Sequence, residues 1–241
     1  MSGNAMSGCT VSDARIEPHW QAAFARVFDL CAARSGETVT VLAETRSRQL
    51  NLTVATAALG ELQLEHDVVT VPSKPASAGP IVRSTGASTA LSGESEAIAR
   101  LHDSDLVIDL TVEGLMHAPE TGAILKSGAR IMSVSNEHPD ILARLVPQPD
   151  MKDIVRDAVA ACRATARMTV TSLAGTDLEI DITDMPTVGV WGWTDRPGTL
   201  AHWPGGLVVG FPREGCCNGR IVFAPGDMNL TFKRYFESEV S

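Results

Sequence analysis

Histidines are the residues of this 241-residue sequence best suited to exchange a proton near neutral pH. The six histidines are scattered, and none stands in an HxH, HxxxH or HExxH spacing that would indicate a metal site. His117 is the most interesting of them because it comes just after an apolar run, 105–111, that predicts a buried strand. In open parallel sheets, ligands bind beyond the carboxyl ends of the strands. We therefore predict that His117 is a general acid or base, the alternative being a histidine that only bonds to the backbone at a helix start.

A second candidate region is the stretch 184–212, which contains three of the four tryptophans and four prolines. Such a density of Pro, Gly and indole rings is typical of a tightly turned loop, and loops on a rigid scaffold often line sites. The alternative is that these rings cap the core of a β-layer. His202 could likewise bind a ligand or brace the loop. We take His202 and Trp203 as candidate substrate-binding residues.

The elements that would position these side chains alternate between strand and helix. Short apolar strands separated by helical periodicity predict an α/β domain, with a doubly wound, mostly parallel sheet, over 16–166. The strands are expected at 37–44, 66–72, 105–111 and 129–135, and the helices at 18–33, 48–59, 94–102, 120–126, 139–145 and 150–167.

The pattern changes after residue 166. Alternating apolar and polar residues in 168–175 and 176–183, around a Gly-Thr pair, predict a hairpin. Two more strands are expected at 219–227 and 228–236. We therefore predict a smaller β-rich domain over 167–241, which looks incomplete, and a disordered N-terminus over 1–15.

Composition excludes several classes of partner. The formal net charge of −9 argues against a nucleic-acid groove, which needs a concentration of Lys and Arg. No apolar run reaches the ~18 residues needed to span a bilayer. The first residues lack the basic-then-apolar order of a signal peptide, and no cysteines form a CxxC pair, so we expect a cytoplasmic protein. No GxGxxG follows the first strand, which disfavours a dinucleotide site.

Several stretches together resemble the 2,5-dihydroxypyridine 5,6-dioxygenases of bacterial nicotinate and pyridine breakdown, whose relatives are leucyl aminopeptidases of the aminopeptidase T type. The resemblance runs from about residue 20 to the end of the sequence, and DRPGTLAHWPGG is its most specific motif. The stretches that carry it are DLVIDL (105–110), HAPETGAILKSGARI (117–131), ILARLVP (141–147), AGTDLEI (174–180), DRPGTLAHWPGG (195–206) and GRIVFAPGDMNLTFK (219–233).

The resemblance implies ring opening of a dihydroxypyridine by O2 at a single Fe(II). It implies that His117 handles the substrate proton and that Met116 lines the ring pocket. The family's iron ligands, two histidines and an aspartate, belong to a C-terminal part that should begin about where this sequence stops. We therefore expect an Fe(II)-dependent ring-cleaving dioxygenase that needs a metal-binding half not in this chain, with no metal ligands among its own residues.

Two alternatives remain open at this stage. The chain could be a non-catalytic binding or subunit module of the same family, which keeps the pocket without the metal. It could also be an aminopeptidase T-like metallohydrolase, but Leu207 stands where those relatives carry a metal-binding glutamate. Under each reading, uncovered strand edges in the β-rich part predict a homo-oligomer or a complementary subunit, beside a small aromatic or N-heterocyclic substrate and O2.

Overall fold

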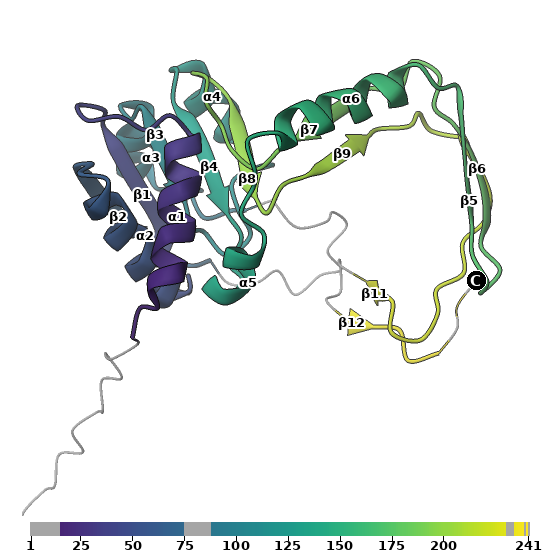
Figure 1. The fold of residues 1–241 in the computed structure, drawn as a ribbon, viewed down its shortest axis with the longest axis horizontal. Helices are drawn as coiled ribbons and strands as arrows, with labels where there is room; N and C mark the ends of the chain where they lie inside the picture. Colours follow the sequence, from purple (N-terminus) through teal and green to yellow (C-terminus); the bar gives the residue numbers. More distant parts are fainter. Residues whose placement is uncertain (1–14, 75–87, 230–233, 239, 241) are drawn as a thin grey trace, which may run out of the picture.

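A computed structural model describes residues 15–74, 88–229, 234–238 and 240, and its central feature is a parallel five-stranded sheet. This sheet confirms the predicted α/β class, and Figure 1 shows its strands side by side. The N-terminus that we expected to be disordered lies outside the described residues up to residue 14. In spatial order the strands are β2 (His66–Val71), β1 (Val39–Glu44), β3 (Leu106–Asp109), β4 (Arg130–Val134) and β8 (Leu200–Trp203).

Helices cover both faces of this sheet. On one face, α1 (Pro18–Leu30), α2 (Gln49–Glu61) and α5 (Pro139–Arg144) enclose a core that includes Phe24 and Phe28, both fully buried. On the other face, α3 (Ser95–His102) and α4 (Thr121–Lys126) enclose a second core around Leu101 and Ile124. Successive strand residues point to opposite faces, so each buried strand contributes to both cores.

The fifth strand comes from a segment that we assigned to the β-rich domain. β8 pairs with β4 in parallel, with Ile131 opposite Leu200 and Val134 opposite Trp203. Leu200 packs against the α3–α4 core, whereas Ala201 and Trp203 belong to the α1–α2 core. Burial on both faces makes these four residues part of the α/β core, so the boundary expected near residue 166 does not separate the sheet from everything that follows.

The helix expected at the end of the α/β domain instead covers a small antiparallel ribbon. α6 (Met151–Arg163) contacts β7 (Thr187–Val190) and β9 (Leu207–Gly210), which pair with each other. A Cβ on Gly189 would lie 2.5 Å from Cγ1 of Val155, so this close helix–strand contact requires glycine. Figure 1 shows α6, β7 and β9 extending away from the sheet.

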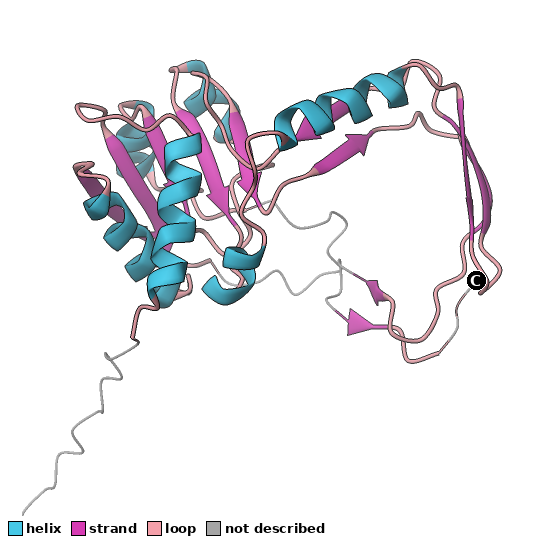
Figure 2. Cartoon of the chain, in the orientation of Figure 1, coloured by secondary structure: helices cyan, strands magenta, loops and turns pink. Residues whose placement is uncertain are grey.

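Beyond this ribbon lies a three-stranded antiparallel sheet of β5 (Arg167–Thr171), β6 (Asp177–Asp181) and β10 (Cys217–Arg220). The β5–β6 pair confirms the predicted hairpin. In Figure 2 no helix lies against these strands. The strand expected over 219–227 is wrong beyond Arg220, because the chain there turns through Pro225 and Gly226. The last pair is short, β11 (Met228–Asn229) with β12 (Arg234–Tyr235), and 230–233 lie outside the described residues.

None of the helices in the described part of the chain has the length and apolar character needed to cross a membrane.

Candidate functional site

Three polar residues form a row across the carboxyl edge of the parallel sheet. Asp109 ends β3 opposite Ser133 of β4, and Ser133 is opposite His202 of β8. Residues in register on neighbouring strands point to the same face. The row therefore continues the side of the sheet covered by α3 and α4, at the edge where parallel sheets bind ligands.

The Asp109 carboxylate is the most buried charged group of the row, with 0% exposure. One oxygen, Oδ1, accepts from the Thr111 backbone N–H at 3.0 Å and from its hydroxyl at 2.7 Å. The other, Oδ2, accepts from the Leu115 N–H at 2.8 Å and from the Ser133 hydroxyl. Burial raises the pKa of Asp109 above its ordinary value, and these four donors oppose that rise.

Met116 and His117 lie in the loop that follows β3. The Ala118 N–H donates to the Leu115 carbonyl at 3.0 Å, so Met116 and His117 are the central residues of a β-turn. Leu115 and Ala118 are buried, Met116 is partly exposed and His117 is exposed. α4 begins four residues after His117, so this histidine does not cap the helix. Its ring has no hydrogen-bond partner among the described residues, which leaves both nitrogens available to a ligand.

His202 has a defined tautomer. Its Nδ1 lies 2.7 Å from the Pro204 carbonyl oxygen, which can only accept, so Nδ1 carries the proton. Nε2 of the neutral ring is then an acceptor. Burial lowers the pKa of His202 below its ordinary value, which keeps the ring neutral at pH 7. Nε2 could therefore accept a hydrogen bond from a hydroxyl or N–H group of a ligand.

This environment predicts a pH dependence of stability. Because the pKa of His202 is lower in the folded chain than in the unfolded chain, the unfolded chain binds more protons below about pH 6.5. The free energy of unfolding should therefore fall as the pH drops from 7.5 to 5.5. Urea denaturation at several pH values measures this fall, and the His202→Gln variant should show less of it. An unchanged slope in His202→Gln would contradict the assignment.

Trp203 points into the α1–α2 core, on the face of β8 opposite to that of His202. Its side chain has 0% exposure, and its ring meets that of Phe24 edge-on with centroids 4.9 Å apart. Its indole N–H donates to the Leu145 carbonyl at 2.8 Å, which connects β8 to the end of α5. These contacts match the alternative reading of the tryptophan-rich stretch, in which the rings cap the core.

Loops on either side of the β1–β3 boundary are joined to each other. The strand order reverses here, and this is where open α/β sheets most often bind ligands. The Ser47 hydroxyl donates to the Leu110 carbonyl at 2.7 Å, and the Val112 N–H donates to the Glu44 carboxylate at 3.1 Å. These bonds bridge the two loops. We therefore take the Met116–His117 turn and His202, which both lie on the α4 side of the sheet, as the candidate site residues.

The described residues do not fit an iron ion. They contain no group of three or more His, Cys, Asp or Glu side chains close enough to hold a metal. A mononuclear iron site of the two-histidine, one-carboxylate type needs such a group.

Sequence reasoning missed the polar residues that organise the loop, namely Asp109, Thr121 and Ser133. Asp109 stands in the run DLVIDL, which we interpreted only as a buried strand. An aspartate in a strand buried on both faces must find donors, because an unpaired buried charge is very costly. That signal was present in the sequence, although the identity of the donors was not.

A parallel sheet with helices on both faces defines an α/β protein, and the polar row lies at the edge where proteins of this class bind ligands. The family model for 2,5-dihydroxypyridine 5,6-dioxygenase matches residues 19–241. The chain belongs to the 2,5-dihydroxypyridine 5,6-dioxygenase family. This confirms the family that the motifs indicated.

A curated relative and a solved structure agree with this assignment. The chain is 31% identical over 220 residues to the 2,5-dihydroxypyridine 5,6-dioxygenase of Pseudomonas putida KT2440. The matched region covers 90% of this chain and 62% of that protein. The solved structure of 2,5-dihydroxypyridine dioxygenase from the same organism superimposes with a TM-score of 0.78, covering 91% of this chain and 63% of that one. The chain thus spans less than two thirds of the length of these relatives.

Proposed function

We propose that this chain supplies the substrate-binding part of a dioxygenase that opens the ring of a 2,5-dihydroxypyridine with O2. The family match over residues 19–241 carries the proposal. The polar row and the adjoining turn supply the chemistry that such a ring needs. In this reading His202 Nε2 accepts a hydrogen bond from a ring hydroxyl or N–H, Met116 packs on the ring, and His117 takes the hydroxyl proton.

The proposed metal is Fe(II), which activates O2 when bound. We propose that its ligands come from a polypeptide part corresponding to the length of the relatives that this chain does not span. Support comes from the described residues themselves, which offer no metal-ligand group. The chain alone is then expected to bind the ring without consuming O2.

Calorimetric titration of the purified chain with 2,5-dihydroxypyridine, without O2, tests the proposal. Hydroquinone, which has the two hydroxyls but no ring nitrogen, is the matched control ligand. We expect saturable binding that is weakened in Met116→Ala and His202→Gln. Absence of binding to the unmodified chain would sink the substrate assignment.

A second candidate is a non-catalytic binding module, favoured by the missing metal-ligand group. O2 uptake with Fe(II) and 2,5-dihydroxypyridine separates the two candidates. Uptake by the isolated chain refutes the module. Uptake only after addition of the complementary part of a relative supports the divided enzyme, and none in either case favours the module. Leu207 lies on β9 opposite Val190, and no contact among the residues that the structure describes favours the aminopeptidase alternative.

We further propose that the three-stranded sheet is a contact surface for a second copy or a complementary polypeptide. Its register places apolar side chains on one face and polar ones on the other. Met168 and Val170 on the apolar face are 43% and 40% exposed, and Val170 lines a cleft of about 570 Å³ together with Leu178. The apolar face carries Met168, Val170, Leu178, Ile180, Cys217 and Gly219; the polar face carries Arg167, Thr169, Thr171, Asp177, Glu179, Asp181, Asn218 and Arg220.

Placing one glutamate on each face in turn tests which face of the three-stranded sheet makes the contact. Val170→Glu should reduce association, because a buried unpaired carboxylate is costly, whereas Thr169→Glu on the polar face of the same strand should not. Light scattering at several concentrations measures the mass. A monodisperse monomer of the unmodified chain at every concentration would contradict self-association.

A further inference from the structure

Buried polar groups hold the Met116–His117 turn at Leu115, the residue that begins it. At its first corner, the Leu115 N–H donates to Asp109 Oδ2 at 2.8 Å. The Leu115 carbonyl accepts two bonds, one from the Ala118 N–H at 3.0 Å and one from the Thr121 hydroxyl. Leu115 is 0% exposed and Ala118 6% exposed, so the two corners are fixed in the core while the two central residues face outward.

The carboxylate that holds the turn, Asp109, belongs to the sheet and not to the loop. Asp109 is the last residue of β3, and the Ser133 hydroxyl of β4 donates to the same oxygen that holds Leu115. Thr121 is the first residue of α4 and is 5% exposed. The turn therefore takes its position from three regular elements, β3, β4 and α4.

We propose that Asp109 and Thr121 are positioning residues that hold the Met116–His117 turn in the conformation that binds the ring. This inference rests on the proposed function, which places the turn in the ring pocket. A turn that is already ordered spares the ligand the entropic cost of ordering it. If a substitution left the turn in the binding conformation for one tenth of the time, the apparent Kd would rise about tenfold.

Thr121 is the sharper probe because its hydroxyl can be removed without changing its shape. Thr121→Val keeps the β-branched side chain and deletes the donor, and Thr121→Ser keeps the donor. Asp109→Asn removes one acceptor oxygen and leaves a backbone or hydroxyl donor without a partner. Thr56→Val is the matched control, since the Thr56 hydroxyl also donates to a carbonyl, that of Leu52 at 3.0 Å, on the opposite side of the sheet.

Two measurements on the full chain test the inference. Hydrogen–deuterium exchange follows the peptide that contains Leu115–Ala118, and calorimetry gives the Kd for 2,5-dihydroxypyridine. We expect faster exchange of this peptide and a Kd raised about tenfold in Thr121→Val and Asp109→Asn. Thr121→Ser and Thr56→Val should retain the exchange rate and Kd of the unmodified chain.

Unchanged exchange in both Thr121→Val and Asp109→Asn would overturn the inference. Faster exchange with an unchanged Kd would overturn it too, because the turn would then be held without serving the ligand. A Kd raised equally by Thr56→Val would show a general loss of stability and would also overturn it. If the unmodified chain does not bind the ring, the proposed function fails, and the exchange rates alone decide whether these groups hold the turn.

Discussion

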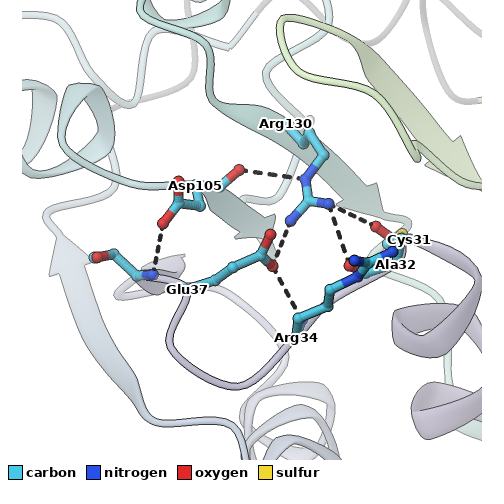
Figure 3. A network of polar contacts seen from close by, with 7 residues as sticks. Cys31, Ala32, Arg34, Glu37, Asp105 and Arg130 are labelled. Atoms are coloured by element: carbon cyan, nitrogen blue, oxygen red, sulfur yellow. Dashed lines mark hydrogen bonds and ion pairs between the residues drawn. The ribbon is translucent and has the colours of Figure 1, made fainter.

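Replacing Arg130 by methionine should lower the free energy of unfolding by about 3–5 kcal/mol, the usual cost of removing one partner from a buried ion pair. Arg130 begins β4, and its side chain is 7% exposed. Figure 3 shows its guanidinium at the centre of a polar network at the amino edge of the sheet. Nη2 donates to Glu37 Oε2 at 2.6 Å.

The same guanidinium also caps the end of α1. Nη1 donates to the carbonyls of Cys31 at 3.0 Å and Ala32 at 3.4 Å, which follow the last turn of that helix. A cation at a helix C-terminus interacts favourably with the helix dipole and satisfies carbonyls that have no partner within the helix. Methionine fills similar space and offers no donor, so the Glu37 carboxylate and both carbonyls would lose this partner at once.

Urea denaturation of Arg130→Met, Glu37→Leu and the double variant would separate the contribution of the ion pair from that of the bonds to the helix end. The double variant should be less destabilised than the sum of the single variants, because it leaves neither charge buried without its partner. Arg130→Lys retains the charge but lacks the planar guanidinium group. Its free energy of unfolding should lie between those of Arg130→Met and the unmodified chain. A loss below about 1 kcal/mol in Arg130→Met, typical of exposed pairs, would contradict the buried role assigned here.

Most regular elements of the α/β part could be predicted because their periodicity is strong. α1 shows apolar residues at helical spacing, and 106–110 is apolar at every position except Asp109. What periodicity cannot supply is the partner of each element. The four residues of β8 have no pattern that distinguishes a fifth parallel strand from a strand of a separate domain. The apolar face of α6 could pack on any apolar surface. Its sequence pattern therefore did not predict that it packs on β7 and β9.

The site was predictable only in part, for a related reason. Placing His117 beyond the carboxyl end of a strand follows from chain order and the general rule for parallel sheets. The alignment of Asp109, Ser133 and His202 depends on strand register across three segments far apart in the sequence. Register is fixed by the packing of both faces, which a single sequence does not display. The resemblance to the family suggested Met116 and His117 for the proposed site, but it did not indicate the polar groups that hold their turn.

Trp203 offers the second large effect, because its ring is one of the largest side chains in the core. Trp203→Ala should lower the free energy of unfolding by about 3–5 kcal/mol, since the cavity would lie beside Phe24 and the Leu145 carbonyl. Trp203→Phe keeps an aromatic ring but loses part of the indole and its bond to the Leu145 carbonyl, so its cost should be lower, about 1–3 kcal/mol.

These two variants also decide between packing and ligand binding for this residue. If the indole only packs in the core, Trp203→Phe should bind 2,5-dihydroxypyridine with the affinity of the unmodified chain, whereas His202→Gln on the same strand should bind it more weakly. If Trp203→Phe loses binding although it remains folded, the ring touches the ligand, and the substrate-binding role predicted from the sequence holds. The neighbouring positions 202 and 203 point to opposite faces of β8. We therefore expect substitution of His202 to lower the affinity for the ligand and substitution of Trp203 to lower the free energy of unfolding.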